Sequence, residues 1–194
     1  MSRRLAVAVV TLLGALLVAT KTARVPDAEM SPSLLPGDLV LILDVQPQEG
    51  DIVAVVDPLD AARWTLRRVH SIGGAVAYDG RAFRSSNRPK VRVLDMGDYL
   101  GRPVYLEGSH LTWGSVESTR LKRDNVGVPD DAVYLGADDR DGALDSRWWG
   151  PVPLAAVRGV VVLRVGSPST PWRRFWGSRG EPAIIPEISK LGRH

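Results

Sequence analysis

Short apolar runs bounded by turn residues dominate the chain after its first two dozen residues. Residues 38–44 (DLVLILD) and 51–57 (DIVAVVD) each begin and end with aspartate, and residues 64–70 alternate between apolar and polar types. Asp79 and Gly80 form a dipeptide that is favoured in tight hairpin turns. No helical period is sustained in this part of the chain. The pattern therefore predicts a mainly β domain with antiparallel or mixed sheets, partly closed in the manner of a barrel.

The N-terminal segment is different, because residues 5–20 (LAVAVVTLLGALLVAT) carry no charge. A helix of this length spans about 24 Å, slightly less than a hydrocarbon core of about 30 Å. The segment could be a cleaved signal peptide, a membrane anchor or a buried helix. A helix packed in the core of the domain is disfavoured because this segment has no polar face. A signal peptide is disfavoured because the segment has no good cleavage site. We expect an uncleaved anchor over residues 1–24, crossing the inner (cytoplasmic) membrane once and leaving the main domain outside the cytoplasm.

The rest of the chain divides into a β domain over residues 25–166 and a tail over residues 167–194. Trp172 and Trp176 enclose two arginines and a phenylalanine in this tail. Aromatic bodies with guanidinium heads suit a lipid headgroup layer or a membrane partner. The alternative is a loosely packed strap over the sheet.

Composition excludes several classes of function. The formal net charge is only +3 and both signs are interspersed, so nucleic acid is not an expected partner. The chain has no cysteine, which excludes disulfides and thiol chemistry. Its histidines, His70, His110 and His194, are far apart in sequence and form no ligand-spaced pair. We therefore expect no metal and no cofactor.

Four blocks of the chain resemble, in order, the sequence motifs of type I signal peptidases. They are EMSPSLLPGDLV at residues 29–40, GDIV at 50–53, LRRV at 66–69 and ADDRDGALDSRWWG at 137–150. The last block is long and unusual, which makes it the most specific of the four. The resemblance covers about residues 5 to 165. It implies a membrane-anchored endopeptidase with an antiparallel or mixed β domain.

The resemblance also implies a serine nucleophile, a neutral lysine base and a second serine that orients the lysine. In this chain those three positions hold Glu29, Arg67 and Ala143. A guanidinium has a pKa above about 12 and cannot act as the base. No catalytic position is intact, so we expect little or no proteolysis. Ser31 or Ser33 could replace the nucleophile, with His70 as its base, although turn serines are usually hydrogen-bonding loop residues.

Opposite charges at two of the changed positions predict an ion pair between Glu29 and Arg67, because a buried charge needs a partner. The alternative is that Glu29 is a solvated loop carboxylate. Asp145 and Arg147 resemble a salt bridge of the family, and their alternative is an ordinary surface pair. The remaining family positions are candidates for binding: Met30, Ser31, Pro32, Arg68, Asp138, Asp141, Asp145, Ser146 and Arg147.

These observations favour a catalytically inactive relative of signal peptidases that binds peptides or regulates other proteins in protein export. The expected partners are membrane lipid and exported or signal-peptide-bearing polypeptides, or an active peptidase. Two alternatives stay open. One is a working signal peptidase with a rearranged site, and the other is a structural subunit of an envelope complex.

Overall fold

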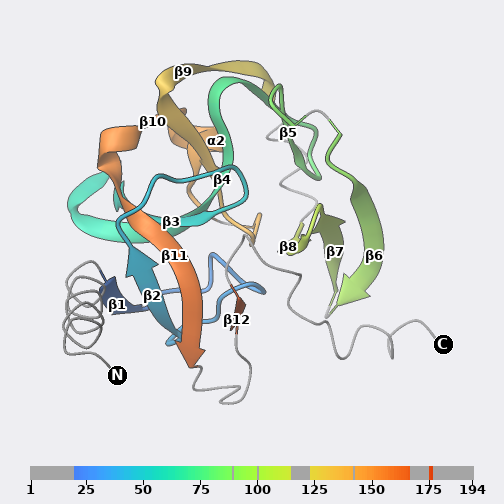
Figure 1. Ribbon diagram of the computed structural model, residues 1–194. Helices are drawn as coiled ribbons and strands as arrows, with labels where there is room; N and C mark the ends of the chain where they lie inside the picture. Colours follow the sequence, from blue (N-terminus) through green and yellow to red (C-terminus); the bar gives the residue numbers. More distant parts are fainter. Residues whose placement is uncertain are drawn as a thin grey trace, which may run out of the picture.

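The computed structural model describes residues 20–88, 90–99, 101–114, 123–141, 143–166 and 175–176. These residues form a nine-stranded sheet and a three-stranded sheet, and every strand pairing within them is antiparallel (Figure 1). The prediction of a mainly β, antiparallel domain is confirmed.

The large sheet has a central path with two short strands attached to it. In spatial order the path contains β1 (Thr20–Arg24), β2 (Leu39–Leu43), β11 (Val157–Gly166), β3 (Ile52–Asp57), β4 (Asp60–Tyr78), β9 (Arg123–Gly136) and β10 (Val152–Pro153). The attached strands are β5 (Phe83–Ser85), which pairs with β4, and β12 (Phe175–Trp176), which pairs with β11. The small sheet contains β6 (Val93–Tyr99), β7 (Arg102–Glu107) and β8 (His110–Trp113), and two short helical turns, α2 (Ser146–Trp149) and η2 (Leu154–Ala156), follow β9.

Closure into a partial barrel was predicted, and this part of the prediction is wrong for the described strands. The path has two ends, β1 and β10, that do not pair with each other. The long strand β4 lies between the two halves of this path. It pairs with β3 along its first part and with β9 from Arg68 onward.

The sheet begins inside the segment that we assigned to the membrane anchor. Thr20–Arg24 pairs in continuous register with Leu39–Leu43. Residues 1–19, which hold most of the predicted anchor, lie outside the described residues. Among those that are described, no helix is long and apolar enough to cross a membrane.

Only two residues of the tail are described. Phe175 and Trp176 pair with Arg164 and Leu163 of β11, so this part of the tail adds a strand to the large sheet. The predicted lipid contact of Trp172 lies outside the described residues.

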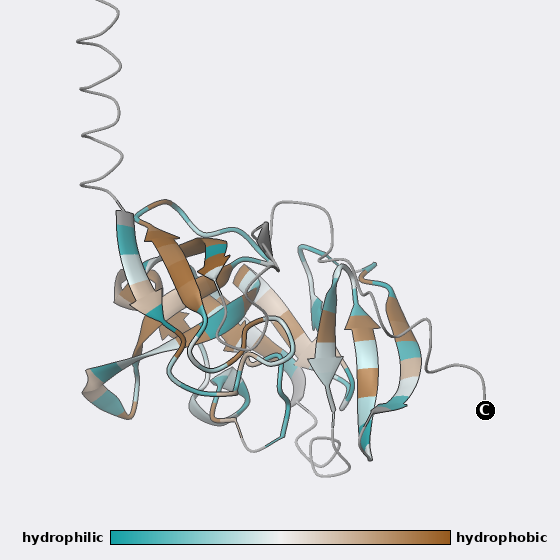
Figure 2. Cartoon of the chain, turned by 90° about the horizontal axis from the view of Figure 1, so that it is seen from below, coloured by the Kyte–Doolittle hydropathy of each residue, from teal (hydrophilic) through white to brown (hydrophobic). Residues whose placement is uncertain are grey.

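The core follows the large sheet, whose strands show apolar segments in Figure 2. One cluster of buried side chains joins the loop between β1 and β2 to the sheet. Met30 and Leu34 of that loop are fully buried against Val40, Ile52 and Leu66. Burial of these two side chains fixes the loop beside β4, and this brings Glu29 close to Arg67.

Candidate functional site

Three chain segments meet beside the middle of β4. The first is the β1–β2 loop with Glu29, the second is β4 with Arg67, and the third is the segment after β9 with Leu144. A backbone hydrogen bond from Asp139 N to Glu29 O, at 2.9 Å, ties the first segment to the third. The predicted site residues from distant parts of the sequence are therefore brought together.

The predicted ion pair between Glu29 and Arg67 is present. Arg67 Nη2 donates to Glu29 Oε2 at 2.5 Å. The same guanidinium donates from Nε and Nη2 to the carbonyl of Leu144, at 3.1 and 2.7 Å. Its Nη1 donates to Thr65 Oγ1 and to the carbonyl of Leu66, each at 2.6 Å. Arg67 is only 2% exposed, so these acceptors replace water around a fixed cation.

Glu29 is less deeply buried than its partner, and its charge is less well stabilised. Its side chain keeps 31% exposure. Burial raises the pKa of Glu29 above its ordinary value of 4.5, although the attraction of Arg67 acts in the opposite direction. Beside this carboxylate, Arg67 has three neutral oxygen acceptors, on Leu144, Thr65 and Leu66.

Ala143 and Ser31 are two further residues that the sequence analysis connected with catalysis, Ala143 as a changed position and Ser31 as a possible replacement nucleophile. Ala143 is buried and brings only a methyl group, where the family resemblance implies a hydroxyl. Ser31 is buried, and its Oγ donates to the carbonyl of Leu34 at 3.4 Å. Within the described part of the chain, no imidazole or amine hydrogen-bonds to Ser31. His70 packs instead on the ring of Phe83, with 4.0 Å between ring centroids.

Arg68, the next residue on β4, forms a second buried ion pair that the sequence did not predict. Its Nε and Nη2 donate to the two carboxylate oxygens of Asp138, at 2.7 and 2.5 Å. Nη1 donates to the carbonyl of Gly50 at 2.7 Å, and Nη2 also reaches Ser33 Oγ at 3.1 Å. Successive strand residues point to opposite faces, which explains how adjacent arginines have different partners.

Asp145 and Arg147 form the predicted salt bridge, and it is buried. Arg147 Nε donates to Asp145 Oδ1 at 2.8 Å, with both side chains fully enclosed. Asp145 also caps α2 and accepts from the backbone N–H of Ala137 at 3.0 Å. Ser146 Oγ accepts from Leu135 N at 3.0 Å, which ties α2 to β9. These residues stiffen the wall of the site, and the surface-pair alternative does not hold.

The other candidate binding residues lie in two different places, the β1–β2 loop and the side of the small sheet. Met30 is a core residue and Pro32 is half-buried in the same loop. Asp141 is 3.5 Å from Arg102 of β7, on the side of the small sheet.

A further buried polar cluster was missed because its members are far apart in sequence. Glu107 Oε1 is 3.6 Å from His70 Nδ1, and Glu107 Oε2 accepts from Arg140 Nη2 at 2.6 Å. His110 Nε2 lies 4.0 Å from Glu107 Oε2. Burial and the nearby arginines hold the pKa of His70 and His110 well below the ordinary value of 6.5. No group of three or more potential metal ligands is gathered anywhere in the described ranges.

Comparison with known proteins gives a family match over most of the chain. The model of a family described as signal peptidase, peptidase S26, matches residues 1–166. Mitochondrial inner membrane protease subunit 1 of Xenopus tropicalis is 38% identical over 82 residues, which are 42% of this chain and 44% of that protein. This match therefore spans less than half the length of that relative.

Two further comparisons extend over more of the chain. Mitochondrial inner membrane protease subunit 2 of Danio rerio is 25% identical over 169 residues, covering 87% of this chain and 73% of that protein. A signal peptidase I of Enterococcus faecalis, a solved structure, is 20% identical with a TM-score of 0.37, covering 60% of this chain and 97% of that chain.

Proposed function

This chain belongs to the signal peptidase family, and we propose that it is a membrane-anchored member that binds or regulates exported polypeptides without cleaving them. The observation that supports the proposal is the state of Arg67. The base in this mechanism must be unprotonated near neutral pH, so that it can accept the proton of the nucleophile. A guanidinium keeps its own proton at that pH. Each of its nitrogens already donates to an oxygen of the chain itself.

Glu29 does not repair this loss. A carboxylate that attacked an amide would form an anhydride, which is a high-energy product. The hydroxyl that would orient a lysine is also missing, because residue 143 is alanine. The Glu29–Arg67 pair therefore acts in this proposal as a structural replacement for a proton-transfer pair.

A free strand edge beside the pair supports peptide binding. Residues 60–67 of β4 pair with β3 on one edge, and pairing with β9 begins only at Arg68. Among the described strands, none covers the other edge of residues 60–67. Trp64 on this stretch is 37% exposed, and Leu144, whose carbonyl accepts from Arg67, is 44% exposed. An extended peptide can add to such an edge through backbone hydrogen bonds, while its side chains contact the apolar groups.

The first experiment tests hydrolysis. Full-length protein in detergent would be incubated with signal-peptide-bearing precursors, beside a variant with Glu29→Ser, Arg67→Lys and Ala143→Ser. We expect no cleavage by the native chain. Cleavage at a defined site by the native chain, lost on Ser31→Ala, would establish the alternative of a rearranged active peptidase and overturn the proposal.

The second experiment tests binding. A fluorescent signal peptide would be titrated into the native chain and into Trp64→Glu, which places a charge on the free edge. Leu59→Glu is the matched control, because Leu59 is an exposed apolar residue at the tip of the same hairpin. We expect weaker binding for Trp64→Glu alone. Absence of peptide binding, together with stable partners in membrane co-purification, would favour a structural subunit instead.

A further inference from the structure

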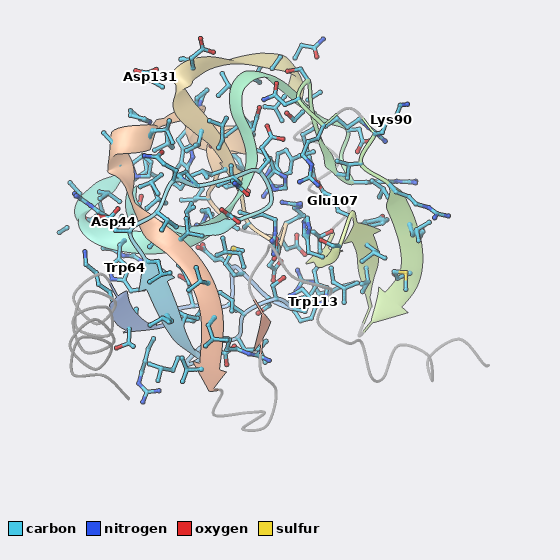
Figure 3. The ribbon with its side chains drawn as sticks, viewed as in Figure 1. Asp44, Trp64, Lys90, Glu107, Trp113 and Asp131 are labelled. Carbon is cyan, nitrogen blue, oxygen red and sulfur yellow. The ribbon has the colours of Figure 1, made fainter. Side chains whose placement is uncertain are left out.

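A cavity of about 320 Å³ lies at the junction of the two sheets, away from the Glu29–Arg67 pair. Arg68 lines the cavity and Arg67 does not. Residues from β4 and β5, the loop before β3 and the turn between β7 and β8 form its walls. Figure 3 shows Glu107, at the end of β7, on the side of the small sheet that faces β4 and β5. The volume is at the small end of the range for small-molecule sites, about 300–1,000 Å³.

One part of the cavity wall is apolar. Val69 and Phe83 are buried core residues, and Val91 completes this wall. His70 and His110 also line the cavity. Because burial and the neighbouring arginines lower the pKa of both imidazoles, they are neutral at pH 7 and do not set its charge.

The charged residues of the wall fall into two groups. Arg68 is paired with Asp138, Glu107 is paired with Arg140, and Asp51 accepts a hydrogen bond from Gln48 N at 2.8 Å. Glu49 and Arg88 differ from these. Within the described ranges, neither has an oppositely charged group at ion-pair distance, although both border the same space.

The hydrogen bonds of Glu49 are one-sided. Its Oε1 accepts from Ile72 N at 3.3 Å, from Ser85 Oγ at 3.1 Å and from Asn87 Nδ2 at 2.9 Å. Its Oε2 is buried and accepts no hydrogen bond from the described residues. Because Glu49 lines the cavity and no described cation neutralises it, a ligand that supplies a cationic donor would offset the cost of holding this carboxylate partly out of water.

Arg88 provides the opposite charge at the opening. Its side chain is exposed, and Nη1 donates to the backbone carbonyl of Glu49 at 3.1 Å. This contact fixes the guanidinium of Arg88 next to Glu49, but a neutral carbonyl does not neutralise the charge of the guanidinium. The remaining N–H groups of the fork suit a carboxylate.

We propose that the cavity binds a small zwitterion, an α-amino acid with an apolar side chain. Its ammonium group pairs with Glu49, its carboxylate pairs with Arg88, and its side chain packs on Val69, Phe83 and Val91. The inference concerns a site separate from the peptide edge and does not depend on the proposed function.

Isothermal titration of the full-length protein in detergent tests the site, with L-leucine as the probe. Isoamylamine carries only the ammonium group and 4-methylpentanoate only the carboxylate. Each analogue lacks one of the two charged contacts, so each should bind at least about tenfold more weakly than leucine, which corresponds to about 1.4 kcal/mol. Glu49→Gln and Arg88→Gln should each weaken leucine binding by a similar factor. Glu49→Gln should not weaken the binding of 4-methylpentanoate, because it removes a like charge from the cavity wall.

Two control variants remove exposed charges outside the cavity wall, Asp44→Asn and Lys90→Gln, and both should leave the leucine affinity unchanged. Circular dichroism of every variant separates loss of binding from loss of folding. No saturable leucine binding up to about 10 mM would overturn the proposal. Equal affinity for leucine and isoamylamine, or full affinity in a folded Arg88→Gln variant, would also overturn it.

Discussion

The two partners of the Glu29–Arg67 pair should contribute unequally to stability. We predict that Glu29→Gln changes the free energy of unfolding by less than about 1 kcal/mol. Arg67→Met, which keeps a long unbranched side chain, should lower it by about 3–5 kcal/mol. The prediction tests whether Arg67 is held mainly by the carboxylate or by the whole set of acceptors.

The magnitudes follow from the contacts. The pKa of Glu29 is raised, so its ionised form is less favourable in the folded chain than in the unfolded chain. Neutral glutamine removes that cost and can still accept from Arg67. Loss of the guanidinium leaves the carbonyls of Leu144 and Leu66 without their donor, beside a half-buried carboxylate without its cation. Each such bond to a charged group is worth about 1.5–3 kcal/mol, although they are not additive.

Urea unfolding of the full-length protein in one detergent, followed by tryptophan fluorescence, measures these differences. In the Arg67→Met background, Glu29→Gln should restore part of the stability, because it removes an uncompensated carboxylate. The pH dependence gives a second check. Because the folded pKa of Glu29 lies above 4.5, acidification toward that value should stabilise the native chain relative to Glu29→Gln. A loss above about 2 kcal/mol for Glu29→Gln, or equal losses for both variants, would refute the reasoning.

Three other perturbations have definite expected outcomes. Asp138→Asn should cost about 3–5 kcal/mol in urea unfolding, since it leaves the buried Arg68 without its counter-ion; a loss under 1 kcal/mol would contradict this. The depressed pKa of His70 means that, on acidification, the unfolded chain takes up the proton before the folded chain does. The free energy of unfolding should therefore fall as the pH drops below 6.5, by up to about 1.4 kcal/mol per pH unit. His70→Asn should reduce that slope. Gly136→Ala should lower the melting temperature, because a Cβ there would come within 2.6 Å of Phe83 and 2.8 Å of the His70 ring. Gly127→Ala, on the same strand, is the control and should leave the melting temperature unchanged, because its Cβ would meet nothing within 4 Å.

The Glu29–Arg67 pair could be predicted from the sequence because two changed positions of one site carried opposite charges. The pair of Asp145 and Arg147 was accessible for a similar reason, since both residues lie in one recognisable block. The Arg68–Asp138 pair was not predicted, because 70 positions separate the partners. Each residue also matches a family motif in its own block, so neither stood out as a charge in need of a partner. The mainly β character followed from the short apolar runs, but the open edges of the sheet depended on how β4 divides its pairing between β3 and β9.

The sequence by itself determined the charge at position 67. A guanidinium stays protonated near pH 7 in any fold, so arginine at this position cannot supply a lysine-like base. Only the tertiary structure decided which acceptors surround that arginine, and which charges border a common cavity. Contacts of this kind depend on loop burial and strand register, which bring together residues such as Glu49, Arg88 and His110 that no local pattern connects.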